Sequence, residues 1–161
     1  MTSPRDRLER LWNRLSAWPG GRWLFARFFG LAVPYSHSVR ARVESLGPGF
    51  CRTTLRDRRR VRNHLDSIHA VALVNLGEMT SGLAMTLALP PGVRGIVTQI
   101  SAEYLKKARG TLSAEATVTV PPIGAAPVDT TVETVIADRD GSPVCRVRTV
   151  WRLERAQPTG A

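Results

Sequence analysis

Apolar and polar residues alternate along most of the second half of the chain. Alternation with a period of two is typical of strands with one buried face. Asp140-Gly141, close to the last of these segments, favours a tight hairpin turn. Two shorter candidates precede them at 39–44 and 50–55, separated by Gly47-Pro48-Gly49. The pattern predicts six strands in all, the later four covering residues 93–105, 111–120, 128–137 and 144–153.

A long apolar segment, residues 68–89, lies between the two groups of strands. Its only charged residue is Glu78, and Pro90-Pro91-Gly92 ends it. Asp66 or Ser67 is the expected N-cap. A helix that is apolar nearly all round must be buried on most sides. We therefore predict an α+β fold in which a curved antiparallel sheet of about six strands wraps one long central helix.

The N-terminal part predicts two further helices. Residues 5–17 carry leucine and tryptophan at spacings of three and four, and a shorter helical segment covers 23–29. Pro34 ends the second segment. These breaks divide the chain into an N-terminal helical extension (1–34), a main domain (35–155) and a flexible tail (156–161).

The formal net charge of +10 is unevenly distributed. Residues 1–62 hold 14 arginines against four acidic residues, whereas the remainder is neutral. This asymmetry argues against a protein devoted to nucleic acid and favours a basic surface that meets phosphates or an anionic membrane. Aromatic residues interleave with arginine over 5–29, so weak peripheral membrane contact is one expectation for this segment.

Cysteine and histidine usage indicates the compartment and excludes some chemistry. Cys51 and Cys145 form no CxxC pair, and no Cys/His cluster has metal-ligand spacing. Two isolated thiols are typical of a reducing cytoplasm. We expect a cytoplasmic protein without a metal or a bound cofactor.

The segment 63–78 resembles the central-helix motif of hotdog-fold thioesterases of the phenylacetate-pathway type. That motif has an Asn, a His-Gly six residues later, and an Asp or Glu nine residues after the His; here Asn63, His69 and Glu78 stand at those spacings. The resemblance covers roughly residues 37–154 and is closest to a branch described as a domain of unknown function. Ala70 stands where many active members have Gly. The resemblance implies a hotdog fold and hydrolysis of an acyl-CoA or acyl-carrier thioester.

Elementary chemistry supports the same residues. A carboxylate on a buried helix is desolvated, so Glu78 would serve as a general base for water or as a nucleophile. The amide of Ala70, at the helix N-terminus, would polarise the thioester carbonyl. His69 would orient the reactants, and the resemblance places Asn63 near the attacking water.

The spacing of His69 and Glu78 predicts an oligomer. Nine residues rotate by about 900° around a helix, so the two side chains point to opposite sides about 13 Å apart along the axis. They can meet only if Glu78 of one subunit faces Asn63 and His69 of another. We expect a homodimer or a homotetramer.

Two basic clusters flank this motif and are the expected contacts of the CoA phosphates. They comprise Arg58, Arg59, Arg60 and Arg62 before the helix, and Lys106, Lys107 and Arg109 after the long strand. Two alternatives to hydrolysis remain: a non-catalytic acyl- or lipid-binding protein, and a 3-hydroxyacyl dehydratase based on His64. The second lacks the Phe-Pro-Gly that follows the histidine in such enzymes, since Leu65-Asp66-Ser67 stands there.

Overall fold

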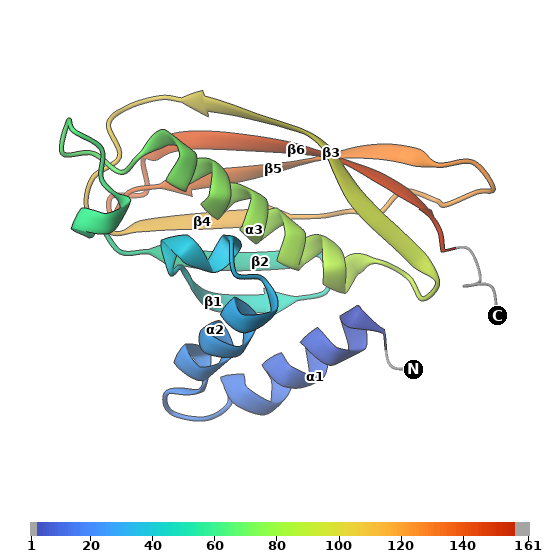
Figure 1. Cartoon of the computed structure of the whole chain (residues 1–161). Helices are drawn as coiled ribbons and strands as arrows, with labels where there is room; N and C mark the ends of the chain where they lie inside the picture. The colour runs from blue at the N-terminus through green and yellow to red at the C-terminus, as the bar shows by residue number, and fades with distance from the viewer. Residues whose placement is uncertain (1–2, 157–161) are drawn as a thin grey trace.

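The computed structural model describes residues 3–156, which contain one six-stranded antiparallel sheet packed against a central helix (Figure 1). The strand order is β1-β2-β4-β5-β6-β3. The strands are β1 (Arg42–Gly47), β2 (Phe50–Leu55), β3 (Val93–Tyr104), β4 (Leu112–Thr117), β5 (Val128–Ala137) and β6 (Pro143–Arg155). The predicted α+β class, with its wrapped central helix, is confirmed.

The central helix α3 (Ala70–Ala88) begins later than the sequence predicted. His69 is its N-cap, and the backbone N–H of Val71 donates to the His69 ring. The prediction that Asp66 or Ser67 caps the helix is wrong. Asp66 adopts a left-handed conformation with φ 52°, and the Ser67 hydroxyl donates to the carbonyl of Ala108. Both residues therefore belong to the connection that enters the helix.

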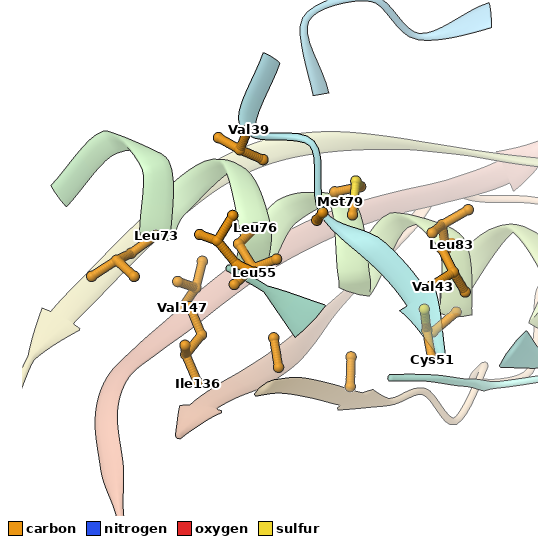
Figure 2. Close-up of a cluster of buried hydrophobic side chains, with 14 of the residues drawn as sticks. Val39, Val43, Cys51, Leu55, Leu73, Leu76, Met79, Leu83, Ile136 and Val147 are labelled. Carbon is orange, nitrogen blue, oxygen red and sulfur yellow. The ribbon is translucent and has the colours of Figure 1, made fainter. Parts of the chain in front are cut away.

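The core lies between α3 and the concave face of the sheet (Figure 2). Leu73, Leu76, Met79 and Leu83 project from the helix toward Val43, Cys51 and Leu55 of β1 and β2 and toward Ile136 and Val147 of β5 and β6. Gly77 brings the helix close to β6, since a Cβ atom there would lie 2.5 Å from Cβ of Val147. The absence of a side chain at 77 thus sets the helix–sheet distance.

Polar side chains between α3 and the sheet form hydrogen bonds across the core. Thr53 and Thr80 share a hydrogen bond of 2.7 Å, and the hydroxyl of Thr134 donates to the carbonyl of Gly77. The Thr149 hydroxyl donates to that of Ser81. Since buried polar groups are costly unless bonded, these pairs fix the register of the helix on the sheet.

By length and composition α3 could cross a membrane, but 67% of its apolar window is buried in the protein. It is the core helix. Cys51 and Cys145 are free thiols in the same core. Burial raises the pKa of Cys51 to about 12 and, together with the nearby Glu103, that of Cys145 to about 11.

Two N-terminal helices, α1 (Pro4–Ser16) and α2 (Gly21–Ala32), pack beside β1 and the C-terminal half of α3 (Figure 1). Ser3 and Asp6 form a capping box that starts α1. Trp12 meets Phe25 edge to face, with ring centroids 5.0 Å apart. Arg5 attaches α1 to the end of α3 by donating to the carbonyl of Leu89. The predicted domain boundaries stay a prediction, and most of the predicted tail, 157–161, lies outside the described residues.

The segment between α2 and the sheet differs from the prediction. Residues Ser36–Val39 form a short 3₁₀ helix, η1, and Arg40 follows with φ 50°. The first strand therefore starts at Arg42 rather than at Val39. A second short 3₁₀ helix, η2 (Arg59–Val61), lies between β2 and α3. The fourth strand is shorter than the apolar alternation over 111–120 predicted. It ends at Thr117, ahead of Pro121-Pro122.

Candidate functional site

Glu78 faces an apolar cavity of about 540 Å³ between α3 and the N-terminal helices. Leu8 and Leu11 of α1 and Phe28 and Phe29 of α2 line one side. The opposite side comprises Glu78, Met79, Gly82, Leu83 and Thr86 of α3 with Trp151 of β6. Among the described residues, Arg7 is the only basic one in the lining. The cavity thus combines a large apolar surface with one carboxylate, as ligand sites commonly do.

The Glu78 carboxylate has no partner among residues 3–156. It forms neither a salt bridge nor a side-chain hydrogen bond there, although its backbone carbonyl accepts from Ser81. Burial raises the pKa of Glu78 above its ordinary value, and no charge in the described part of the chain offsets this effect. A half-buried carboxylate with an unfilled bonding capacity can take a proton from water or attack an electrophilic carbon.

Gly82 and Trp151 shape the space beside this carboxylate. Gly82 is one helical turn after Glu78, and a Cβ atom on it would lie 3.8 Å from Oε1 of Glu78 and 3.6 Å from the Trp151 ring. The Trp151 indole N–H donates to Thr149, whose hydroxyl donates to Ser81 on α3. Sequence reasoning missed both residues, although a glycine four positions after the only charge of the helix was an available signal.

Asn63 organises the turn that precedes α3. Its side-chain oxygen accepts from the backbone N–H groups of Leu65 and Ser67, at 2.9 and 3.2 Å. Such a bond pattern stabilises a turn and occupies the side-chain oxygen. The amide nitrogen remains the group that could donate to a ligand.

His69 and Ala70 lie at the exposed end of the same helix. Because Nδ1 of His69 accepts from the Val71 N–H, the proton of the neutral ring resides on Nε2. The Ala70 carbonyl accepts from the Tyr104 hydroxyl at 3.3 Å. Asn63, His69 and Ala70 do not line the Glu78 cavity, so one chain does not bring the predicted site together. Their roles stay predictions.

A family model matches residues 21–153, and its family is described as a domain of unknown function, DUF4442. The match covers well over half of the chain. The chain belongs to this family. A comparison with curated proteins found no match.

Solved structures place the DUF4442 chain among hotdog folds. The structural-genomics protein APC5556 is 28% identical with a TM-score of 0.80, over 92% of this chain and 98% of that one. A Pseudomonas aeruginosa protein of unknown function, called a probable thioesterase, is 19% identical with a TM-score of 0.69, over 78% and 90%. A Haemophilus influenzae thioesterase is 17% identical with a TM-score of 0.67, over 79% and 87%. The predicted hotdog fold and domain-of-unknown-function branch are confirmed.

Most of the predicted CoA-phosphate residues of this DUF4442 chain have protein partners. Arg58 donates to the carbonyl of Val39, Arg62 pairs with Asp57 at 2.6 Å, and Lys106 pairs with Asp138 at 2.6 Å. Arg109 donates to the carbonyls of Asp66 and Leu65. Within residues 3–156, three exposed members of the predicted set have no partner: Arg59, Arg60 and Lys107. Phosphate binding by either cluster stays a prediction, and these three are its strongest members.

The aromatic residues of the predicted membrane segment divide into two groups. Trp12 and Phe25 are buried between α1 and α2, so these two side chains are not available to a membrane. Trp18 and Trp23 remain 72% and 61% exposed, and Leu31 is 75% exposed. The DUF4442 chain therefore presents an apolar surface on α2 and the α1–α2 turn that its own fold does not cover.

Proposed function

We propose that the chain is a hydrolase that cleaves acyl-CoA or acyl-carrier thioesters with Glu78. The observation that carries this proposal is the unpaired Glu78 carboxylate, whose pKa burial raises, on the wall of an apolar cavity. The cavity suits an acyl group, because its lining is mostly aliphatic and aromatic. The thioesterase names of structural neighbours agree with this chemistry.

The proposed reaction adds water to the thioester carbon. Glu78 accepts one proton from a water molecule while the oxygen of that water attacks the carbonyl carbon. The attack forms a tetrahedral oxyanion. The C–S bond then breaks as the protonated Glu78 returns its proton to the leaving sulfur, which releases a free thiol and restores the carboxylate of Glu78. The carboxylic acid product loses its own proton to solvent and becomes a carboxylate. Direct attack by Glu78 is the variant of this step, and it forms an anhydride that water hydrolyses to the same products.

We propose that a second subunit supplies the remainder of the site. The Ala70 N–H would hold the oxyanion, and the Asn63 amide and the Nε2–H of His69 would orient water or the carbonyl. These groups surround the exposed N-terminal end of α3, whereas Glu78 lies in the cavity beneath α1. In an isologous dimer, or in each dimer of a tetramer, Glu78 of either subunit would face Asn63, His69 and Ala70 of the other. Two equivalent sites would result.

One observation favours a non-catalytic acyl-binding protein as the second candidate. The Asn63 oxygen and the His69 Nδ1 are both used within the fold, so each side chain retains only its donor groups. A site with only donors and one carboxylate would also hold a fatty acid or a thioester without turnover. By contrast, His64, on which dehydration would depend, is exposed and does not line the cavity.

The test is release of free thiol from acyl-CoAs of graded chain length. We expect activity that Glu78→Gln lowers by a factor of about 10² or more, since removal of a general base typically costs that much. Glu115→Gln is the matched control, because Glu115 is an exposed carboxylate that pairs with Arg52 on the sheet. A folded protein that releases no thiol but copurifies with an acyl ligand would replace hydrolysis by acyl binding.

We further propose a cytoplasmic protein in weak contact with anionic membranes. Its free thiols are suited to a reducing compartment. Its exposed aromatic residues adjoin arginines of α1 and α2, which is the composition of interfacial helices.

A further inference from the structure

A second cavity of about 540 Å³ lies on the other side of α2, and cationic side chains dominate its lining. Five arginines line it: Arg27, Arg40, Arg42, Arg56 and Arg58. Trp23, His37 and Thr54 complete its polar and aromatic wall, and none of the acidic residues within 3–156 lines it. Five guanidinium groups around one cavity repel one another, so a bound anion would relieve that repulsion.

The neighbouring carboxylates are shared among several donors. Glu44 accepts from the Thr54 hydroxyl at 2.8 Å and from Arg22 at 3.2 Å. Asp57 binds Arg62 and the backbone N–H of Gly110. Within residues 3–156, Glu44 is therefore the one carboxylate that pairs with a cavity arginine, Arg42, and the other four have no acidic partner.

Arg58 is held by a hydrogen bond, and both Arg58 and Arg42 carry a buried Nε–H without an acceptor. Arg58 donates through Nη2 to the carbonyl of Val39 at 2.6 Å, and its Nε is buried without a partner. Nε of Arg42 is likewise buried without a hydrogen bond and lies 3.8 Å from Glu44. Burial lowers the pKa of Arg58, and so do the neighbouring charges of Arg40, Arg56 and Arg60. Such preorganised donors are typical of a binding site rather than of a solvated surface.

We propose that this cavity binds a small ligand with two clustered phosphates, a diphosphate or a bisphosphate group. Guanidinium groups bind phosphate oxygens through paired N–H donors, and several of them suit a multivalent anion better than a single charge. Trp23 is 61% exposed at the cavity and offers an aromatic face to an attached base or apolar group. The volume lies within the range of small-molecule sites.

This site is distinct from both parts of the proposed thioester site. Only Arg58 belongs to the basic residues expected to hold CoA phosphates. Helix α2 separates the two cavities, with Ala26 and Arg27 lining this one and Phe28 and Phe29 lining that of Glu78. Phosphate binding here does not depend on thioester hydrolysis, and it can be measured without any activity.

The decisive experiment is calorimetric titration of the whole chain with inorganic pyrophosphate at low ionic strength. We expect saturable binding that is weaker for orthophosphate and weaker in high salt. Arg27→Gln and Arg56→Gln should each weaken pyrophosphate binding by about tenfold, the effect of one charged hydrogen bond. Both side chains are exposed and form no hydrogen bond or salt bridge among residues 3–156, so thermal unfolding should be nearly unchanged. Arg10→Gln, an exposed helix arginine outside the cavity, is the matched control.

Two further titrations distinguish the source of the phosphates. Adenosine 3′,5′-bisphosphate should displace pyrophosphate if the ligand is a soluble nucleotide, and Trp23→Ala should then weaken the nucleotide but not pyrophosphate. If the phosphates belong to a lipid headgroup, vesicles of phosphatidylglycerol in phosphatidylcholine should displace pyrophosphate instead. The proposal is overturned if pyrophosphate does not bind, or if Arg10→Gln weakens binding as much as Arg27→Gln and Arg56→Gln do.

Discussion

Glu78 illustrates a conflict between stability and function at one residue. Its carboxylate is desolvated without a compensating partner among the described residues, so its pKa is raised in the folded state. Below the unfolded-state pKa both states are protonated and burial costs no ionisation energy. As pH rises through the raised value, the folded protein must ionise a disfavoured group and loses stability.

Replacement of Glu78 by glutamine should therefore stabilise the protein at neutral pH. We expect a gain of roughly 0.5–2 kcal/mol, as for other substitutions that relieve a functional site. The gain should vanish as pH falls toward the ordinary Glu value, where the wild-type carboxyl is also neutral. Thermal unfolding of both proteins across this range provides the measurement. A gain that persists in acid would show that ionisation is not its cause.

Two glycines of α3 provide a matched comparison of space at the residue scale. Gly77→Ala places a methyl group 2.5 Å from Val147 and should destabilise the fold by about 1–3 kcal/mol through overpacking. Gly82→Ala meets its neighbours at 3.6 Å or more and should add up to about 1 kcal/mol from helix propensity. Denaturant unfolding of the two variants distinguishes these effects. Equal changes would contradict the close helix–sheet approach at Gly77.

At the scale of elements, local patterns predicted the strands and the central helix but missed contacts between distant segments. The apolar segment 68–89 correctly predicted α3. The start of the helix was not predicted, because its N-cap is His69 and histidine is not a preferred N-cap residue. The Glu78 cavity arises because Leu8 and Leu11 of α1 meet a helix about 70 residues later in the chain. Local periodicity carries no information on such a contact. The sequence therefore identified Glu78 as a candidate but did not predict that α1 would cover it.

The exposed surface of α2 and the α1–α2 turn leads to a prediction about membranes. Trp18 and Leu31 are among its most exposed apolar residues. We expect the chain to cosediment with anionic vesicles, and Trp18→Ser with Leu31→Ser to reduce binding severalfold, since each removes apolar area from the interface. Leu105→Ser is the control, because Leu105 is an exposed apolar residue outside α1 and α2. Unchanged sedimentation after deletion of residues 1–30 would dismiss the membrane role.

For the whole molecule, β3 indicates how subunits would associate. It is an edge strand twelve residues long, and Ile96 and Ile100 on it are 64% and 42% exposed. A long apolar edge with unpaired backbone groups commonly pairs with another chain. The thioesterase proposal needs that second chain, because Glu78 and the end of α3 that carries His69 have different surroundings in one subunit.

We accordingly predict a stable dimer or tetramer in light scattering, and Ile96→Lys should shift it toward monomer. A mixture of Glu78→Ala and Asn63→Ala proteins should recover activity that neither has alone, because a hybrid dimer contains one intact site. A monomer at micromolar concentration, or no recovery in verified hybrids, would exclude the shared site.

The deep placement of both cysteines has a practical consequence. Thiols with pKa values of about 12 and 11 are almost wholly protonated near neutrality, and maleimides attack only accessible thiolates efficiently. The wild-type chain should therefore be nearly inert to such reagents while folded. A single surface cysteine, such as Leu31→Cys, would accept one fluorophore without prior removal of the native residues. Its emission would report directly whether α2 faces water, lipid or another subunit.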